Sequence, residues 1–417
     1  SDAPAIRFKG FSDAWEQREV GDLLIERSQQ APMSDEYPLM AFIANEGVAP
    51  KGERYDRSAL VTDTVNKLYK KTEKGDFIYS SNNLETGSIG LNKYGKACIS
   101  PVYSIFEPTG IADSDFLGRR LVRKDFINAM VKWRQGVIYG QWRIHESDFL
   151  KIEISVPSVE EQRKIGAYLD QLDNLITLHQ RKFEKLTNVK KSMLEKMFPQ
   201  NGSSYPEIRF KGFTDPWEQR KFGEVFDCTV PNNTLSRAEL SYDEGTVLNV
   251  HYGDVLIKYG SVLDVQKDDI PRIPHRCRED FNGALLQDGD VIIADTAEDE
   301  TTGKACEIGN LQGSAIVSGL HTMVCRPRNR MALGYLGYYL NSNAYHHQLL
   351  PLMQGIKVLS LSRSNIQKTS VSYPTAVKEQ QLIAYYFSQL DNLITLHQRE
   401  LEKLQNIKKS MLEKMFV

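Results

Sequence analysis

The stretch QLDNLITLHQR occupies residues Gln171–Arg181, and the same eleven letters return at Gln389–Arg399. Each copy lies inside a long, highly charged stretch of helical pattern that closes one half of the chain. When Glu161–Phe198 is compared with Glu379–Phe416, 28 of 38 positions are identical. The sequence therefore indicates a duplication of one ancestral half, and the fold has to be interpreted as two like halves.

The two halves also begin alike, because Ile6–Arg18 and Ile208–Arg220 differ at only two positions. In each opening, a Ser-Asp or Thr-Asp pair is an N-cap candidate for a short helix that carries the tryptophan, Trp15 or Trp217. We expect the aromatic residues of these openings to be core anchors rather than ligand contacts.

Between each opening and its long helix, the pattern changes to short strands broken by Gly, Pro and Asn, with one helical stretch. This texture runs from about Leu24 to Val156 and from Phe226 to Ser372, and it predicts two mixed α/β domains. The expected strands include Asp76–Tyr79, Cys98–Ser100, Val102–Phe106, Val255–Ile257 and Val291–Ala294, and the expected helices are Asp125–Arg134 and Ala332–Leu350.

These two inserts share only short matches. The matches are Gly95–Cys98 with Gly303–Cys306, and Gln135-Gly136 with Gln354-Gly355. The frame is thus nearly duplicated while the inserts have diverged. We infer that the repeated parts bind the same thing twice and that the diverged parts bind different things.

Each long helix follows a proline, and Ser158–Glu161 fits a capping box for the first one. Apolar residues then recur at alternating steps of four and three, which is a heptad seam. The first seam is Ile165, Leu169, Leu172, Ile176, Phe183, Leu186, Met193 and Met197, with His179 and Lys190 at its two other positions. The second is Ile383, Phe387, Leu390, Ile394, Leu401, Leu404, Met411 and Met415, with His397 and Lys408 likewise.

We expect His179 and His397 to be packed and hydrogen-bonded rather than bound to a metal. A second apolar stripe widens the face and leaves apolar surface for other subunits. It consists of Leu175, Val189 and Leu194, and of Leu393, Ile407 and Leu412.

The repeat order predicts an α+β fold in which two mixed α/β domains are separated by two long helices that form an antiparallel coiled coil. Domain boundaries are expected at 1–156 for the first domain, 157–199 for its helix, 200–206 for a linker, 207–373 for the second domain and 374–417 for its helix. A pseudo-two-fold arrangement makes the object effectively circular, with Phe416-Val417 near Ser1. Each helix is roughly 58 Å long at ~1.5 Å per residue.

Such a pair of helices is a ruler with a different head at each end. If the heads read DNA, their half-sites should lie about one helical turn, roughly 34 Å, apart. Because the heads differ, the target should be asymmetric and bipartite rather than palindromic.

The composition sets few limits, since a net charge of −2 does not announce a nucleic-acid binder. No apolar run is long enough to span a membrane, and five cysteines without paired metal spacing favour a reducing cytoplasm. Gly90–Ala97 matches GxxxxGK but lacks the hydroxyl residue of a P-loop, and no Pro-Pro dipeptide supports an amino-methyltransferase site. The chain therefore has no recognisable catalytic motif.

The order of domain, proline-led Glu-Gln helix start and long helix, given twice, resembles the specificity subunit of type I restriction–modification enzymes. The resemblance covers the whole chain. It rests on Pro157, Glu161-Gln162 and Ile165, on Pro374, Glu379-Gln380 and Ile383, and on the two repeated stretches quoted above.

The resemblance implies a non-catalytic subunit with two target recognition domains, each reading one half of a split double-stranded DNA sequence. It also implies that two adenine-N6 methyltransferase (modification) subunits dock on the helices and that two ATP-dependent restriction subunits complete a phage-defence enzyme. S-adenosylmethionine, ATP and Mg²⁺ would then be bound by those partners. The helices carry 8 basic and 6 acidic residues in Glu160–Phe198 and 6 and 5 in Lys378–Val417, so the rest of the chain is acidic, and we expect the docked subunits to supply much of the phosphate contact.

Direct readout requires polar side chains on exposed loops. The predicted base contacts are Tyr139, Gln141 and Arg143, with Asn82 and Asn83, in the first domain, and Lys258, Tyr259, Thr296, Lys357, Ser360 and Arg363 in the second. The basic clusters Lys70-Lys71, Arg119-Arg120 and Arg326 with Arg328 are predicted to hold phosphates.

Two other functions remain open from the sequence. One is a coiled-coil scaffold whose heads bind proteins. The other is a self-contained nuclease or methyltransferase, which the absence of motifs disfavours.

Overall fold

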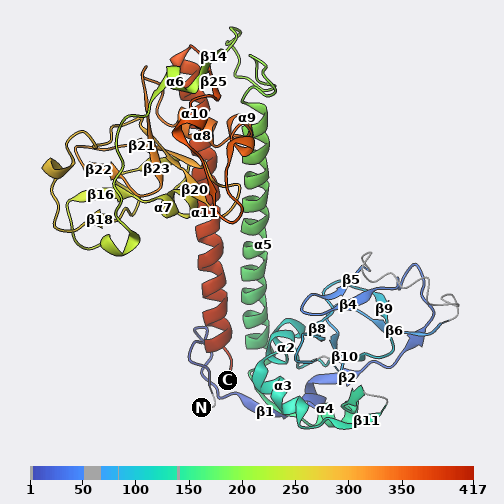
Figure 1. The fold of residues 1–417 in the computed structure, drawn as a ribbon. Coiled ribbons are helices and arrows are strands. Elements are labelled where there is room, and N and C mark those ends of the chain that lie inside the picture. The colour runs from blue at the N-terminus through green and yellow to red at the C-terminus, as the bar shows by residue number, and fades with distance from the viewer. Residues whose placement is uncertain (1–2, 51–66, 83, 139–140) are drawn as a thin grey trace. The chain divides into compact units, whose positions relative to one another are not determined.

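The computed structural model describes residues 3–50, 67–82, 84–138 and 141–417, with backbone only at 136–138 and 141–142. The chain forms two compact units. Unit 1 is Ser1–His179 with Glu400–Val417, and unit 2 is Gln180–Arg399. Each unit therefore contains one mixed α/β module and a part of both long helices, α5 (Val159–Lys196) and α11 (Val377–Lys414), which stand out in Figure 1.

In unit 1, the module contains a four-stranded antiparallel sheet in the order β2-β10-β7-β8 and a three-stranded one in the order β3-β6-β9. The pairs β1-β13, β4-β5 and β11-β12 complete it. The strands are β1 (Glu16–Glu19), β2 (Leu24–Glu26), β3 (Gln30–Ala31), β4 (Ala41–Ile43), β5 (Gly47–Ala49), β6 (Tyr69–Thr72), β7 (Phe77–Tyr79), β8 (Ile89–Leu91), β9 (Ala97–Ile99), β10 (Ser104–Pro108), β11 (Gln135–Ile138), β12 (Gln141–Arg143) and β13 (Glu153–Val156). Its short helices are α1 (Val20–Leu23), α2 (Ser114–Arg120), α3 (Lys124–Val131) and α4 (Glu146–Leu150).

In unit 2, a five-stranded sheet in the order β15-β23-β19-β21-β17 lies beside a three-stranded sheet, β18-β16-β22, and the pairs β14-β25 and β20-β24. Its strands are β14 (Glu218–Lys221), β15 (Phe226–Asp227), β16 (Val247–Val250), β17 (Val262–Asp264), β18 (Arg272–Ile273), β19 (Val291–Ala294), β20 (Thr296–Ala297), β21 (Ala305–Gly309), β22 (Ala315–Ser318), β23 (Thr322–Pro327), β24 (Leu359–Ser360) and β25 (Ser370–Tyr373). The helices are α6 (Phe222–Val225), α7 (Tyr252–Ile257), α8 (Tyr335–Leu340), α9 (Asn343–His346) and α10 (Arg363–Ile366), with 3₁₀ turns η3 (Arg237–Glu239), η4 (Arg278–Phe281) and η5 (Leu350–Leu352).

Each large sheet is organised around one strand that is buried on both faces. Successive side chains of a strand point to opposite faces. On β19, Val291 and Ile293 pack into one core, whereas Ile292 and Ala294 pack into another. On β7, the side chains on either side of Ile78 enter one core and Ile78 enters the second. The continuous apolar sequence of these strands follows from this double burial.

The end of the opposite long helix completes the core of each module. In unit 1, Phe416 stacks on Phe116 with ring centroids 5.3 Å apart, and it shares its core with Ile165, Leu169 and Leu172 of α5. In unit 2, Phe198 stacks on Phe387 at 5.8 Å. In each unit the last residues of one helix thus meet the first turns of the other, so the packed segments run antiparallel, as the repeat order predicted.

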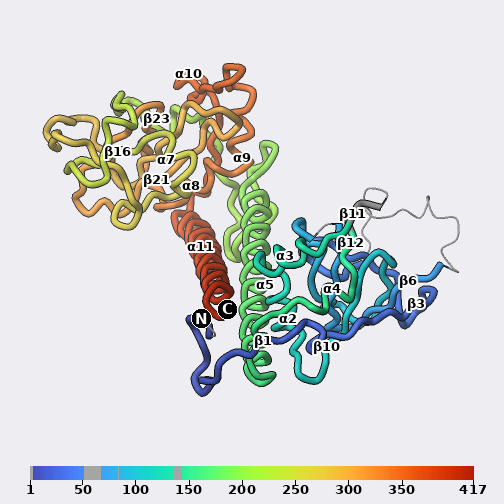
Figure 2. Tube along the Cα trace, turned by 90° about the horizontal axis from the view of Figure 1, so that it is seen from below, coloured from blue at the N-terminus to red at the C-terminus, as the bar shows by residue number. Residues whose placement is uncertain are grey.

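Backbone hydrogen bonds tie each opening segment to the same helix end. Ile6 N donates to Lys414 O at 2.9 Å, and Ile208 N donates to Lys196 O at 2.9 Å. The beginning of the described chain and its C-terminal end accordingly lie side by side in unit 1 (Figure 2). This agrees with the expected circular order, although Ser1 itself lies outside the described residues.

A buried ion pair fixes each opening to the first turn of a long helix. Arg7 donates two hydrogen bonds to Glu161, both of 2.7 Å, and Arg209 does the same to Glu379 at 2.7 and 2.9 Å. Both carboxylate side chains are only 1 % exposed. The Glu161 side chain therefore pairs with arginine instead of closing the expected capping box. Only Ser158 Oγ takes its part in that box, as acceptor of the Glu161 amide at 3.4 Å.

The middle of the helices follows the heptad seam. Ile176, Phe183 and Leu186 on α5, and Ile394, Leu401 and Leu404 on α11, are half-buried, while most positions between them are exposed. His179 and His397 are half-buried as well. The two lysines of the seam make the same ion pair in each unit, Lys408 to Asp173 and Lys190 to Asp391, both at 2.5 Å.

Several local expectations were wrong. Val255–Ile257 is not a strand but belongs to α7, where His251 Nδ1 accepts from Gly253 N at the N-cap. Neither tryptophan lies in a helix, since each directly precedes a strand, β1 or β14, but both are buried as the core anchors that we expected. The helix expected over Ala332–Leu350 is divided into α8, α9 and part of η5.

The match of Gly95–Cys98 with Gly303–Cys306 is also not structural. Ala97 lies on β9 of the three-stranded sheet, whereas Ala305 lies on β21 beside the central strand of the five-stranded sheet. The register of that sheet instead pairs Ala305 with Ile293, as Ile89 pairs with Tyr79 in unit 1.

Glu307 is a buried carboxyl group within the core of unit 2. It lies on β21, is 1 % exposed, and accepts a 2.9 Å hydrogen bond from Gly337 N on α8. Burial raises the pKa of Glu307 to about 7, although backbone N–H groups from Gly337, Gly334 and Leu336 oppose the shift. Ionisation above that pH is therefore unfavourable in the folded state.

We predict that Arg7→Met destabilises the chain by about 3–5 kcal/mol, because it leaves the Glu161 carboxylate buried without its cation. Arg7→Met combined with Glu161→Gln should recover most of that loss. The control is Arg18→Met, since Arg18 pairs with Glu16 in an exposed bridge and should cost less than about 1 kcal/mol. Equilibrium urea unfolding measures all three, and an Arg7→Met effect as small as that of the control would contradict the prediction.

A second prediction concerns pH. Because the pKa of Glu307 is higher folded than unfolded, its contribution to the free energy of unfolding falls as pH rises from about 4.5 to 7. Glu307→Gln keeps an acceptor for Gly337 N and cannot ionise. Relative to wild type, this variant should gain up to about 3 kcal/mol between pH 4.5 and 8. Thermal or urea unfolding at several pH values checks this, and a difference that is flat with pH would refute it.

Candidate nucleic-acid interface

The two modules present one corresponding pair of segments at the end of their central strands. Phe77 on β7 pairs with β10 and β8, and Val291 on β19 pairs with β23 and β21. A Gly-Asp dipeptide precedes both strands. With Phe77 and Val291 equivalent, Asn82 and Thr296 occupy the same place just beyond the strand, and both had been predicted to contact bases.

A hairpin lies next to this place in each module. In unit 1, Ser81 Oγ accepts a hydrogen bond from Ile144 N at 3.0 Å, just after β12. In unit 2, Asp295 O accepts from Leu361 N at 2.8 Å, just after β24. The residues that precede these donors, Arg143 and Ser360, are therefore equivalent too. The short match of Gln135 with Gln354 agrees, because these residues pair with Arg143 and Ser360 across the two hairpins.

We define the strand-end surface by these residues. In unit 1 it is Ser81, Asn82 and Arg143, and in unit 2 it is Asp295, Thr296 and Ser360. In unit 2, Thr296 and Ser360 are direct cross-strand partners of β20 and β24. The structure thus brings together predicted residues that are 64 positions apart in the sequence.

The hairpin of unit 2 extends this surface with exposed side chains. Ile356 is 99 % exposed, and Val358 and Lys357 on the same turn are exposed too. The turn needs a glycine, because Gly355 has φ +128° and a Cβ there would lie 1.9 Å from Val358 O. Arg363 is exposed at the first position of α10. Lys357 and Arg363 are therefore available to a ligand.

In unit 1, the evidence is narrower. Arg143 is 64 % exposed, with its guanidinium 3.9 Å from Glu146. Lys70 is half-buried on β6. Tyr139 and Asn83 lie outside the described residues, and nothing is described of the Gln141 side chain.

Other predicted contacts have structural partners instead. Tyr259 is 3 % exposed inside a hydrophobic core, so its side chain does not reach the surface. Lys258 pairs with Asp269 at 2.8 Å and lies over the ring of Tyr242. Arg326 is bound to Asp290 at 2.7 Å. Sequence patterns did not reveal these roles because each partner comes from another part of the chain.

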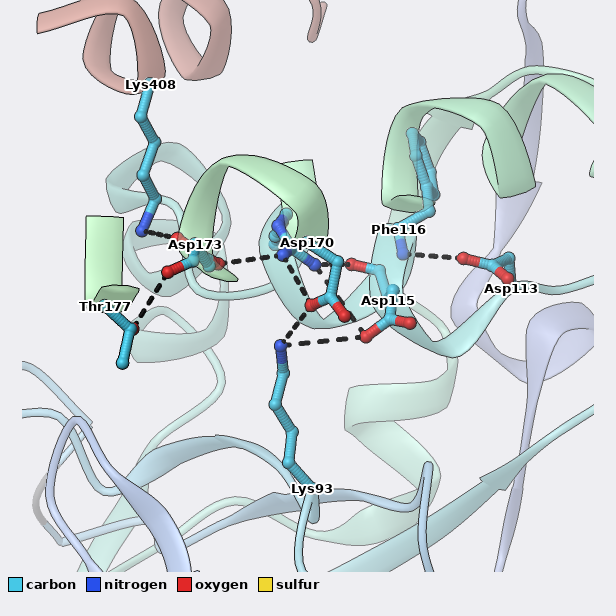
Figure 3. Close-up of polar contacts among 9 residues, drawn as sticks. Lys93, Asp113, Asp115, Phe116, Asp170, Asp173, Thr177 and Lys408 are labelled. Carbon is cyan, nitrogen blue, oxygen red and sulfur yellow. Dashed lines mark hydrogen bonds and ion pairs between the residues drawn. The ribbon is translucent and has the colours of Figure 1, made fainter. Parts of the chain in front are cut away.

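Arg119 and Arg120 are likewise engaged by carboxylates. Figure 3 shows the network beside α5, in which Arg119 pairs with Asp170 at 3.1 Å and with Asp173 at 2.9 Å. Lys93 joins at 2.7 Å from Asp170. Arg120 pairs with Asp125 at 2.8 Å. These arginines hold the module to the helix, which is a sufficient reason for the basic cluster.

Sequence reasoning missed His321. Its Nδ1 lies 3.4 Å from Thr296 Oγ1 and 3.5 Å from Asp295 Oδ1, at the strand-end surface of unit 2. No spacing signal in the sequence could have found it, because the turn between β22 and β23 brings it there.

The long helices carry a repeated exposed apolar patch. Leu175 and Leu178 on α5 are 43 % and 46 % exposed, and Leu393 and Leu396 on α11 are 43 % and 52 % exposed. The other members of the predicted second stripe pack against the cores, namely Val189, Leu194, Ile407 and Leu412. Each helix thus presents one leucine pair to solvent.

Within the described ranges, no three His, Cys, Asp or Glu side chains gather in a way that suits a metal ion. Over the same part of the chain, none of the helices has the length and apolar character needed to cross a membrane.

Comparisons with known proteins agree with this architecture. A family model described as the type I restriction modification DNA specificity domain matches residues 13–188 and again 214–406. The type I restriction enzyme MjaVIII specificity subunit of Methanocaldococcus jannaschii is 22 % identical, over 95 % of this chain and 91 % of that protein. The putative type I restriction enzyme MjaX specificity subunit of the same organism is 23 % identical, over 66 % of this chain and 60 % of that protein.

Among solved structures, the S subunit of the type I restriction–modification system from M. genitalium superposes with a TM-score of 0.54. It covers 100 % of this chain and 99 % of that one at 14 % identity, so it supports the fold alone. The family model accounts for both halves of the duplication. The chain therefore belongs to the type I restriction modification DNA specificity domain family and is a specificity subunit, the non-catalytic component of a type I restriction–modification enzyme.

Proposed function

We propose that the modules within residues 1–156 and 207–373 each read one half of a split, asymmetric DNA target. One observation carries the proposal: the strand-end surface recurs at the same place in both modules with different side chains. Asn82 and Arg143 in unit 1 stand where Thr296 and Ser360 stand in unit 2. A surface that is conserved in place and changed in chemistry suits two readings of one kind of ligand.

The side chains on this surface suit base edges. Asn and Arg make bidentate hydrogen bonds to adenine and guanine in the major groove, and Ser and Thr hydroxyls serve several bases. We assign Asn82 and Arg143 to the first half-site, with Tyr139, Asn83 and Gln141 as further candidates. We assign Thr296, Ser360, Lys357 and Arg363 to the second half-site. Arg119, Arg120, Lys258 and Tyr259 are left out, because the structure gives them partners or buries them.

The helices are proposed to set the unread spacer between the two half-sites. Helix α5 is continuous over 38 residues and contributes to both units, which makes it roughly 57 Å long. The ion pairs Lys408–Asp173 and Lys190–Asp391 fix its register against α11 within each unit. A fixed helical register gives a fixed spacer.

The exposed leucine pairs are proposed to dock two copies of one partner. Leu175 and Leu178 recur as Leu393 and Leu396 within the identical QLDNLITLHQR stretches, so both patches offer the same chemistry. Two adenine-N6 methyltransferase subunits fit this duplication, and two ATP-dependent restriction subunits would complete a cytoplasmic assembly. S-adenosylmethionine, ATP and Mg²⁺ would be bound by those subunits.

The alternative is a scaffold whose heads bind proteins. The leucine pairs would suit it, but polar strand-end surfaces with Arg143, Lys357 and Arg363 favour nucleic acid. Sequence-dependent binding of DNA by the chain with its methyltransferase subunits separates the two, since a scaffold would show none.

We predict that replacing Phe226–Ser372 with the corresponding module of another family member changes only one half of the methylated target. The reason is that all described strand-end residues of unit 2 lie within this segment. Methylation-site sequencing in a host that carries the matching modification subunit provides the readout. The reciprocal replacement of Leu24–Val156 is the control and should change the other half; a replacement that altered both halves would refute the division.

The spacer proposal has its own test. One heptad inserted after His179 and one after Arg399 keep the seam in register and add about 10 Å of helix. The unread gap should lengthen by about 3 base pairs, at roughly 34 Å per 10 base pairs. A chain whose native heptads at these points are replaced by others of equal length is the control, and a heptad insertion that left the gap unchanged would disprove the ruler.

A further inference from the structure

His321 adopts a backbone conformation that side chains rarely take. Its φ is +54°, in the left-handed region, which glycine favours and where Asn, Asp and His are the commonest other residues. The residue lies in the turn between β22 and β23, and Asp295 N donates to His321 O at 3.1 Å. Strained residues persist where the surrounding structure fixes them, and they gather at functional sites.

A buried polar network fixes this turn. Gly319 O accepts hydrogen bonds from Thr322 Oγ1 at 2.5 Å and from Asn232 Nδ2 at 3.2 Å. Asn249 is fully buried against the same glycine, where a Cβ would lie 2.7 Å from its Nδ2. Buried polar groups are costly unless they are bonded, so a network of this kind specifies one conformation. Its effect here is to hold His321 at the surface.

The imidazole of His321 is anchored on one side and free on the other. Its Nδ1 faces Asp295 Oδ1 and Thr296 Oγ1, and its ring meets Tyr252 edge to face at a centroid distance of 5.3 Å. The side chain is 47 % exposed. Across the described residues, Nε2 has no hydrogen-bond partner. With Nδ1–H directed at the carboxylate, the neutral ring presents Nε2 as an acceptor to whatever binds at Thr296.

The corresponding position in unit 1 has opposite chemistry. Ser104 pairs with Tyr79 on β7, as Met323 pairs with Ile293 on β19. Two residues earlier on each strand, Val102 therefore corresponds to His321. Val102 is 64 % exposed, and it lies in the turn that leads into β10. One position of the shared frame thus offers an apolar side chain in one module and a hydrogen-bonding one in the other.

We propose that this position determines sequence specificity in both modules. Val102 contacts a base pair in the first half-site, with its methyl groups matched to the thymine C5-methyl group in the major groove. His321 contacts a base pair in the second half-site through Nε2, with Asp295 as the positioning residue. This inference rests on the proposed function, because it presupposes that each module reads a half-site.

The test uses the full chain together with its methyltransferase subunits in a host lacking the system. Methylation is compared at sites that differ from the target by one base. His321→Gly removes the imidazole without backbone strain at φ +54°, and Val102→Ala shortens the apolar contact. The matched control is His275→Gly, since His275 is an exposed left-handed histidine (φ +57°) in the turn after β18.

We expect His321→Gly to relax discrimination about 10- to 100-fold at one position of the second half-site and to leave the first half unchanged. Val102→Ala should relax one position of the first half only, and His275→Gly should match wild type. Thermal melting shows whether each variant is folded. If His321→Gly does not fold, His321→Asn decides, because Asn tolerates the left-handed region and replaces the imidazole by an amide with a different base preference.

Folded His321 and Val102 variants with wild-type discrimination at every position would overturn the inference. This outcome differs from a failure of the proposed function. In that case the unmodified chain itself would not direct methylation to a split target, whatever residue stands at 102 or 321.

Discussion

The structure depends on an exchange of helix ends. The core of each module lacks a wall until the last turn of the opposite long helix fills it, with Phe416 in unit 1 and Phe198 in unit 2. Burying one such side chain contributes about 1.5–3 kcal/mol. The neighbouring methionines, the backbone bond from each opening segment and the Arg–Glu ion pair add to it. Neither module is complete with its own half of the chain, so the halves have to stay together.

This frame is duplicated down to single contacts, and the modules attach to it by different chemistry. Asp173 and Asp391 take the same lysine of the opposite helix. In unit 1 the module meets Asp173 with the Arg119 guanidinium, whereas in unit 2 it meets Asp391 with the Tyr338 hydroxyl at 2.8 Å. Gln162 and Gln380 accept hydrogen bonds from the backbone of equivalent segments, at Asp113 N and Ala332 N. Because these anchors keep the module orientation constant, the strand-end surface is free to vary.

Much of this was legible in the sequence, because duplication and heptad spacing are local patterns. The seam of α5 and α11, the antiparallel packing of their segments and the core tryptophans all follow from repeat order and apolar period. The equivalence of Arg143 and Ser360 was visible as a short match at Gln135 and Gln354. Long-range pairing was not visible. The partners of Arg119 and Arg120 and the burial of Tyr259 depend on which segments the tertiary fold brings together.

The same reason explains the false alignment of Gly95–Cys98 with Gly303–Cys306 and the missed His321. Four identical letters on short, unlike strands carry less information than one strand register. The left-handed turn that presents His321 has no sequence signature, since only its buried network reveals that the conformation is fixed. Position within the fold, rather than identity of letters, defines what the two modules share.

Two unlike surfaces on one duplicated frame should recognise a target of two unlike parts. Mapping every methylated adenine at base resolution, in a host with and without the unmodified chain and its methyltransferase subunits, tests this most directly. The account predicts two short specified segments of different sequence, separated by a constant number of unspecified bases. A single uninterrupted motif, or two segments that are inverted copies of each other, would contradict it.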